Sequence, residues 1–122
     1  MNFDEALKDH FEWRVKFRLA IAQKGTMDVA TISKDNCCEL GAWLRGEGSY
    51  KYRQLANFSK CVAQHAAFHA EAGKIASVIN AKEYTKAEAM IGMGTTYDAT
   101  SIATGLAIKE LQRECELHDS GH

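Results

Sequence analysis

The 122-residue sequence contains no proline. Inside a helix proline costs about 3 kcal/mol relative to alanine, because it removes a backbone donor and its ring clashes with the preceding turn. Alanine, which has the highest helix propensity, is frequent along the chain. The absence of proline therefore favours an all-α fold.

Charge of one sign and long apolar runs are also lacking. The 15 basic and 16 acidic residues are interspersed and give a net charge of −1. Nucleic acid and anionic membranes favour a basic patch, so neither partner is expected. No apolar run approaches the ~18 residues of a membrane-spanning helix. The acidic, amphipathic start MNFDEALKDH is not a secretory signal, so we expect a cytoplasmic domain.

Cysteine is scarce as well, with four residues at Cys37, Cys38, Cys61 and Cys115. In a reducing compartment such thiols serve as small buried side chains or as metal ligands more often than as disulfide partners. The adjacent pair Cys37 and Cys38 would form a bridge only with strain. No disulfide framework is therefore expected, and Cys115 is expected to pack in the core.

Apolar residues recur at three- and four-residue spacing over three long segments, which predicts three helices. The first runs from Phe3 to Gln23 and ends at a C-cap glycine, Gly25. The second runs from Ser49 to Asn80 and the third from Thr85 to Cys115. The side chains expected to face the core are Phe3, Leu7, His10, Phe17, Ile21, Leu55, Phe58, Val62, His65, His69, Ala72, Ala76, Ile79, Met90, Met93, Tyr97, Thr104, Ile108 and Leu111.

Shorter features complete the expected domain. Residues 25–36 form a connection with at most one helical turn, and Cys38 to Leu44 form a short helix that ends at the glycines of RGEGSY. The prediction is one four-helix-bundle-like domain over residues 1–122, with the short helix carrying a cysteine. The tail from about residue 117 is expected to be frayed, with His118 and His122 in solvent.

A second apolar line, separate from the core stripe, is expected on the last helix. It consists of Ile91, Ile102 and Leu106. An apolar line that faces away from the core favours contact with another molecule. We therefore expect this line to be the partner or dimer face.

The segment QHAAFHAE places two histidines four residues apart on the core stripe of the second long helix. Side chains at positions i and i+4 lie one turn apart on the same face, so the imidazoles of His65 and His69 can reach one ion. Each neutral imidazole in an apolar stripe needs both a donor and an acceptor partner. This requirement favours a metal ligand role over two structural histidines.

His10 and one cysteine are further candidate ligands. His10 lies on the inward stripe of the first helix, and bundles place metal sites where inward side chains from several helices converge. Cys38 begins the short helix, where the helix dipole favours the thiolate that zinc binds. Cys37 is an alternative, and Cys61 offers another thiolate but more simply packs between helices. Three imidazoles and one thiolate fill a tetrahedral zinc site, which favours a structural or sensory role over a catalytic one.

The order D-H-F-E-W, then C-E-L-G-A-W-L with G-E-G-S-Y behind it, then H-A-A-F-H resembles the chemoreceptor zinc-binding (CZB) domain family. The resemblance extends from about residue 4 to residue 113. The C-x-L-G-x-W-L block together with the HxxxH pair is more specific than either motif alone. Carried over one residue at a time, the ligands of that family correspond to His10, Cys38, His65 and His69. The resemblance thereby selects between the two adjacent cysteines.

The resemblance implies a regulatory role. Domains of this family occur on bacterial chemotaxis receptors and diguanylate cyclases, respond to zinc or to oxidants such as hypochlorous acid, and are often homodimeric. We therefore expect a Zn²⁺-binding sensor without catalytic activity, in which Cys38 is the redox-sensitive residue. Its expected partners are a second copy of the chain and a signalling output module, in cis or in trans. The chain is expected to be free-standing or a fragment of a larger receptor.

Three other functions are compatible with inward histidines in a helical bundle. A hemerythrin-like di-iron oxygen carrier would need bridging carboxylates, but the residues four after His10 and His69 are Arg14 and Gly73. A zinc hydrolase would need a general base, and Ala66 stands where the HExxH motif has glutamate. A purely structural helical interaction module would use the histidines as core residues and bind no metal.

Overall fold

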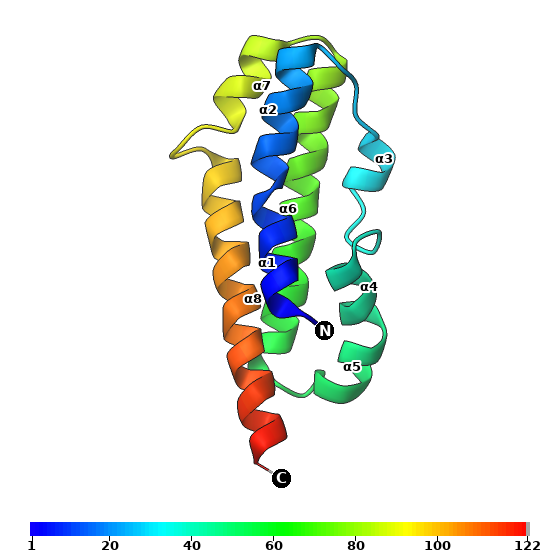
Figure 1. Ribbon diagram of the computed structural model, residues 1–122, viewed down its shortest axis with the longest axis vertical. Helices are drawn as coiled ribbons and strands as arrows, with labels where there is room; N and C mark the ends of the chain where they lie inside the picture. Colours follow the sequence, from blue (N-terminus) through cyan, green and yellow to red (C-terminus); the bar gives the residue numbers. More distant parts are fainter. Residues whose placement is uncertain (122) are drawn as a thin grey trace.

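A computed structural model describes residues 1–121, and all regular structure in this range is helical (Figure 1). The elements are α1 (Phe3–Phe11), α2 (Trp13–Gln23), α3 (Val29–Ile32), α4 (Glu39–Arg45), α5 (Glu47–Tyr52), α6 (Ala56–Asn80), α7 (Tyr84–Met90) and α8 (Thr96–Ser120). The all-α fold expected from the sequence is confirmed. Among the described helices none has the length and apolarity to cross a bilayer.

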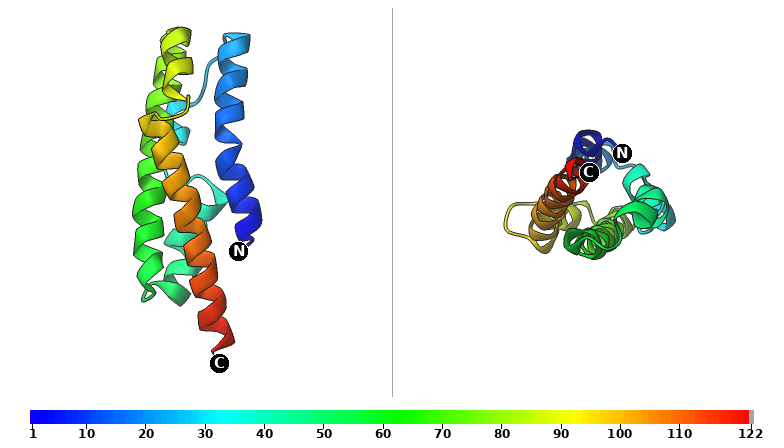
Figure 2. Two further views of the ribbon diagram at one scale, coloured as in Figure 1. Left: turned by 90° about the vertical axis from the view of Figure 1, so that its left-hand side faces the viewer. Right: turned by 90° about the horizontal axis from the view of Figure 1, so that it is seen from below.

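The helices form four columns, which are seen end-on in the right-hand view of Figure 2. One column is α1 followed by α2, one is α6, one is α7 followed by α8, and the fourth is the chain of short helices α3, α4 and α5. The fourth column replaces the continuous helix of a regular bundle. The cysteine-bearing segment belongs to this irregular column, as expected.

The first predicted helix is present as two collinear helices joined at Glu12, whose backbone stays in the right-handed helical region. Its last residue is Gln23, as expected, but the residue that caps it differs. Lys24, not Gly25, takes the left-handed conformation with φ 52°, while the Gly25 amide donates to the Ala20 carbonyl. The pattern is a Schellman-type end in which lysine occupies the position that glycine favours.

The prediction of one continuous last helix was wrong. The chain breaks between Met90 and Thr96, where Gly94 has φ +79°. Thr95 caps α8 by accepting from the Asp98 amide, and the Asp98 carboxylate accepts from the Gly94 amide. These bonds satisfy backbone donors that a new helix start leaves free.

The break moves two side chains from their predicted faces, because the residues on either side of it no longer share one helix register. Met93, which was expected in the core, lies in the connection and is 93 % exposed. Ile91, which was expected on the second apolar line, is buried in the core. Of that line, Ile102 and Leu106 are exposed as expected.

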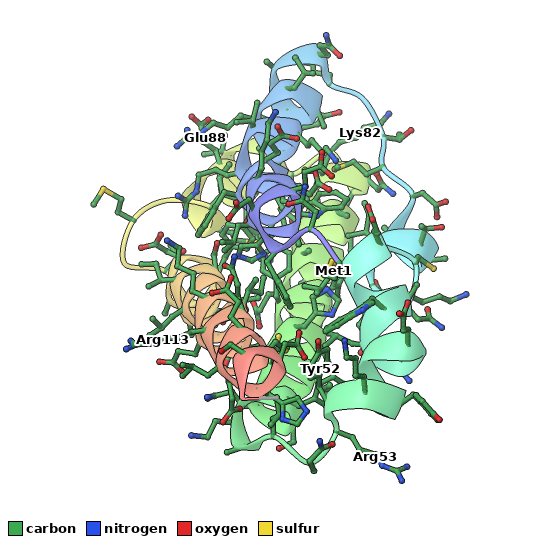
Figure 3. All side chains as sticks on the ribbon, turned by 60° about the horizontal axis from the view of Figure 1, so that its bottom comes forward. Met1, Tyr52, Arg53, Lys82, Glu88 and Arg113 are labelled. Atoms are coloured by element: carbon green, nitrogen blue, oxygen red, sulfur yellow. The ribbon has the colours of Figure 1, made fainter. Side chains whose placement is uncertain are left out.

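The end of α8 also differs from the prediction. The helix continues to Ser120, beyond the expected end at Cys115. The Tyr52 hydroxyl donates to the Asp119 carboxylate at 2.7 Å, and the rings of Tyr52 and His118 meet edge to face. Figure 3 shows Tyr52 on α5 beside this last part of α8. His118 is therefore half-buried, whereas His122 lies outside the described residues.

Two apolar clusters fill the bundle. The upper cluster, at the end of the bundle formed by α2 and α7, is built around Phe17, Phe68, Ile75, Ile79, Ile91 and Tyr97. The lower cluster, at the end formed by α4 and the last part of α8, is built around Leu40, Leu44, Phe58, Cys61, Ile108, Leu111 and Cys115. The expected burial of Cys115, and of Cys61 between helices, is confirmed. Phe3, Ile21, Leu55, Val62 and Met90, also expected inside, are half-buried at the rim. Between the two clusters lie buried polar residues of α1, α6 and α8.

Candidate metal centre

The two histidines of α6 face the interior between the clusters. His65 and His69 are 4 % and 3 % exposed, and their ring centroids lie 4.5 Å apart. Their Nε2 atoms approach to 3.1 Å. The helical repeat alone produces this arrangement, since residues four apart are stacked by one turn.

Cys38 brings a thiol to the same point from the irregular column. It is the N-cap of α4, with an extended backbone, and its Sγ accepts from the Gly41 amide at 3.3 Å. The same sulfur lies 3.3 Å from His65 Nε2 and 3.7 Å from His69 Nε2. A side chain at Gly41 would collide with the Asp35 carbonyl, so glycine lets the start of α4 pack against the preceding turn. The capping geometry therefore fixes the sulfur beside both imidazoles.

A backbone carbonyl sets the orientation of His69. Its Nδ1 lies 2.8 Å from the carbonyl oxygen of Ile32, at the end of α3. A carbonyl can only accept, so Nδ1 carries the proton and Nε2 keeps a free lone pair. Metal-binding histidines in proteins are held in the same way, by a donor bond from the second ring nitrogen.

His10 faces the same region from α1 but is held differently. Its Nε2 lies 2.9 Å from the Ser101 carbonyl oxygen and 3.2 Å from the Ser101 hydroxyl. Its ring packs against Phe68 at a centroid distance of 4.2 Å. Donation from Nε2–H to the carbonyl leaves Nδ1 as the free nitrogen.

The structure thus brings three of the four predicted ligands together. The donor atoms of Cys38, His65 and His69 all lie within 4.8 Å of one another, and in residues 1–121 this is the one such group of three or more His, Cys, Asp or Glu ligands. His10 does not belong to that group. It lines the same cavity, of about 40 Å³, as the three grouped residues. Its role as fourth ligand stays a prediction.

Burial sets the protonation of these groups. It lowers the pKa of His65 to about 4, with a smaller contribution from the neighbouring His69, and it also lowers the pKa of His10. Burial raises the pKa of the Cys38 thiol, and the Gly41 amide opposes this only in part. The expected preference for thiolate at the helix start is thus outweighed by desolvation in the metal-free chain. A cation that binds at Cys38 displaces the proton of its thiol.

The spacing of the three donor atoms fits a tetrahedral zinc site. Zinc bonds of about 2.0–2.1 Å to nitrogen and 2.3 Å to sulfur place two nitrogens roughly 3.3 Å apart and nitrogen and sulfur roughly 3.6 Å apart. The observed separations are 3.1 Å between nitrogens and 3.3 and 3.7 Å from sulfur to nitrogen. The mixed sulfur and nitrogen donor set is one that zinc prefers.

The other cysteines lie away from the three grouped donor atoms. Cys37 is exposed, and its Sγ lies 3.6 Å from the side-chain oxygen of Asn36. Cys61 and Cys115 are buried in the lower cluster, where burial raises the pKa of their thiols to about 12 and about 11. Of the adjacent pair, the structure therefore places Cys38 and not Cys37 beside the histidines.

Several groups that support the site were not foreseen from the sequence. They are the backbone carbonyls of Ile32 and Ser101 and the amide of Gly41. Backbone groups carry no signature in a sequence, because every residue has them. One supporting feature does leave a trace in the sequence, which is Gly73. A side chain at Gly73 would collide with Ser33, so the glycine is needed where α3 approaches α6 closely.

Comparison with known proteins adds one finding. The family model described as the chemoreceptor zinc-binding domain matches residues 10–76, which is more than half of the chain. The match begins at His10 and includes Cys38, His65 and His69. No curated protein and no solved structure matches the chain. The resemblance stated from the motifs is thereby confirmed over this range.

Proposed function

The chain belongs to the chemoreceptor zinc-binding domain family, and on that premise we propose that it is a zinc-dependent sensory domain without catalytic activity. The metal is Zn²⁺, held by Cys38, His65 and His69, with His10 as fourth ligand. The observation that carries the proposal is the convergence of one sulfur and two nitrogen atoms at the separations of a tetrahedral zinc site.

The three grouped ligands join two columns of the bundle, α6 and the column of short helices. Cys38 belongs to the start of α4, the two histidines to α6, and the Ile32 carbonyl that orients His69 to α3. When bound, zinc supplies the positive charge that holds a thiolate inside an apolar interior. The metal–ligand bonds then connect the column of short helices to α6. Short helices are marginally stable by themselves, so this connection stabilises their position.

Two inputs would break this connection between the short helices and α6. A fall in zinc activity empties the site by mass action, and the binding free energy is lost from the folded state. Oxidation of Cys38 to a sulfenic acid removes the thiolate and lowers zinc affinity. An oxidant such as hypochlorous acid and the zinc level would therefore act on the same switch.

The proposed output is a change at the surface of the bundle that a signalling partner reads. We place the domain in the bacterial cytoplasm, as part of a chemotaxis or cyclic-di-GMP signalling system. Its partners are a second copy of the chain and a receptor or cyclase output module, in cis or in trans. Neither nucleic acid nor membrane is a partner in this proposal, because the charges are balanced and interspersed.

The hemerythrin-like alternative lacks support in the described residues. A di-iron site needs bridging carboxylates, and the group of clustered ligands in residues 1–121 contains a thiol and two imidazoles but no carboxylate. An optical spectrum separates the two functions, because zinc is colourless. A purely structural module is separated from a zinc sensor by metal analysis of protein purified without an affinity tag.

The test of the proposal is zinc content in Cys38→Ser. We expect the untagged chain to contain one zinc per molecule and Cys38→Ser to lose it at micromolar free zinc, with helix content by circular dichroism largely unchanged. His65→Ala and His69→Ala should behave alike. His118→Ala, at the far end of α8, is the control and should keep its zinc. Tightly held zinc in Cys38→Ser would refute the ligand assignment.

A further inference from the structure

We propose that Cys37 is the resolving thiol of the site, which converts oxidised Cys38 into a reversible disulfide between the two adjacent residues. The inference rests on the proposed function, since it takes Cys38 as the thiol that the oxidant reaches. It adds a residue that the family motif does not contain. The step protects the metal ligand from irreversible oxidation.

The two adjacent thiols differ in exposure and in partners. Cys37 is exposed, whereas Cys38 is half-buried with its sulfur 3.3 Å from His65 Nε2 and 3.7 Å from His69 Nε2. Cys37 is not part of the metal-ligand group, so its thiol stays available while Cys38 is engaged. A redox-sensitive cysteine with an accessible second thiol next to it is the usual arrangement for a resolving step.

The backbone around the pair leaves room for such a reaction. Both cysteines precede the first residue of α4, and neither lies within a helix. Cys37 lines an open surface groove with Ser33, Lys34, Asp35, Asn36, Arg45 and Ala66. The Cys37 sulfur makes a long contact of 3.6 Å to the side-chain oxygen of Asn36, which does not fix the rotamer of the thiol. The backbone at Cys37 is not held by the hydrogen bonds of a helix.

The other two cysteines are poor candidates for the resolving role. Cys61 is fully buried and Cys115 is 3 % exposed, both inside the lower apolar cluster. Their thiols are also shielded from water and stay protonated, which suppresses their reactivity. Cys37, in contrast, is the residue directly before Cys38, so the two Cα atoms stay one peptide unit apart in every conformation of the chain.

The chemistry needs one two-electron oxidant, for which we name hypochlorous acid or a peroxide. With hypochlorous acid, the Cys38 thiolate takes the hydroxyl group, an S–O bond forms, and chloride leaves with the electron pair. The Cys37 sulfur then attacks the Cys38 sulfur. The S–S bond forms, the S–O bond breaks, and the hydroxide leaves as water with the Cys37 thiol proton. Two thiol sulfurs are oxidised by two electrons in total, and one oxidant is reduced.

Strain makes this disulfide easy to reverse. Adjacent Cα atoms lie about 3.8 Å apart, below the roughly 4.4–6.8 Å that unstrained disulfides span. A strained disulfide has a higher reduction potential and is reduced more readily by cellular thiols. Such a bond suits a signal that must be switched off, and it is unsuited to a structural role. The oxidised state would thus be transient in a reducing cytoplasm.

Peptide mapping tests the proposal directly. Trypsin cleaves after Lys34 and Arg45, so both cysteines fall in one peptide, DNCCELGAWLR, while Cys61 falls in another, CVAQHAAFHAEAGK. After one equivalent of hypochlorous acid and alkylation, we expect the first peptide to be lighter by two hydrogens and unalkylated. A cross-link between the two peptides, or a disulfide-linked dimer on a non-reducing gel, would overturn the proposal.

Two variants complete the test. In Cys37→Ser we expect a sulfenic acid at Cys38 that dimedone traps, and zinc binding that dithiothreitol no longer fully restores after excess oxidant. Cys115→Ser is the control and should recover zinc as the wild-type chain does. Equal loss of recovery in wild type and Cys37→Ser would also overturn the proposal. Zinc retention by Cys38→Ser, in contrast, would refute the proposed function itself, so the two failures are distinguishable.

Discussion

At the scale of single residues, the ligands differ in how far the sequence could determine their positions. His65 and His69 were predictable from spacing alone, because the helical repeat puts them on one face. Cys38 was selected over Cys37 through the family resemblance, and the N-cap geometry that places its sulfur became visible only in the structure.

The apolar pattern of the first helix predicts the direction of the His10 side chain but not its hydrogen-bond partner. Its inward direction was correctly predicted from the stripe of the first helix. Its hydrogen bond to Ser101, 91 positions along the chain, depends on how α1 packs against α8. No periodicity in either helix encodes that contact, so the sequence could suggest a ligand but not its present partner.

The burial of His65 predicts acid sensitivity of the metal-free chain. Its pKa falls from 6.5 to about 4 on folding, so between these values the unfolded chain binds a proton that the folded chain does not. Stability therefore rises with pH through this window and is lost as pH falls, by roughly 3 kcal/mol at its lower end. Urea unfolding in the presence of a chelator, at several pH values from 7 down to about 4, measures the effect.

The matched variant for this measurement is His65→Gln, which keeps a polar side chain but has no proton to gain. Its stability should fall less steeply with acid than that of the wild-type chain. Carboxylates whose pKa is lowered on folding, such as Asp98 and Asp119, contribute to both curves and cancel in the comparison. Identical pH profiles for the two chains would contradict the assigned protonation of His65.

At the scale of helices and turns, the long elements were predictable and their interruptions were not. Apolar periodicity gave the end of α6 at Asn80, but the single helix predicted from Ser49 was wrong, because the chain breaks at residues 53–55 between α5 and α6. The same apolar periodicity continues through residues 91–95 and gives no indication of the break before α8. A helix start is nevertheless indicated there by Thr95, a capping residue followed three positions later by the acidic Asp98. Apolar periodicity alone cannot locate such a break, because the apolar residues on its two sides keep helical spacing.

The contact between α3 and α6 predicts a long-range effect on the metal centre. A Cβ atom added at Gly73 would meet the Ser33 hydroxyl and lie 3.0 Å from Ser33 Cβ. Gly73→Ala should therefore push α3 away from α6 and weaken the bond between His69 and the Ile32 carbonyl. We expect unfolding free energy to fall by about 1–3 kcal/mol and zinc affinity to fall roughly tenfold, as for loss of a supporting ligand contact. Denaturant unfolding and competition with a zinc indicator measure the two effects.

Two further variants separate this contact from general effects of adding alanine. Gly92→Ala adds a Cβ whose nearest neighbour, the Ala89 carbonyl oxygen, lies at an ordinary 3.5 Å, so zinc affinity should not change. Ser33→Gly combined with Gly73→Ala removes the obstructing side chain and should restore affinity in part. An unchanged zinc affinity in Gly73→Ala alone would show that α3 does not support the site.

At the scale of the whole molecule, one long side of the bundle carries exposed apolar side chains. Along α1 and α2 they follow at four-residue steps, and along α8 two more lie one turn apart. The residues are Phe11, Val15, Leu19, Ile102 and Leu106, all between 51 % and 63 % exposed. The Phe11 ring closes against Gly105 of α8, which makes the two helices one continuous surface. This side includes the part of the predicted second apolar line that faces solvent.

A surface of this kind favours self-association, since apolar side chains that line two adjacent helices gain free energy when a second copy covers them. We expect the chain to sediment as a dimer at micromolar concentration and Leu106→Glu to shift it to monomer, because each copy would bury an unpaired carboxylate. Tyr50→Glu changes a side chain on α5 that is more exposed, at 90 % against 57 % for Leu106, and should leave the dimer intact. Zinc content should stay the same in both variants, as neither position touches the metal centre. A wild-type chain that sediments as a monomer, or a Leu106→Glu variant that remains dimeric, would assign this surface to a different partner than a second copy.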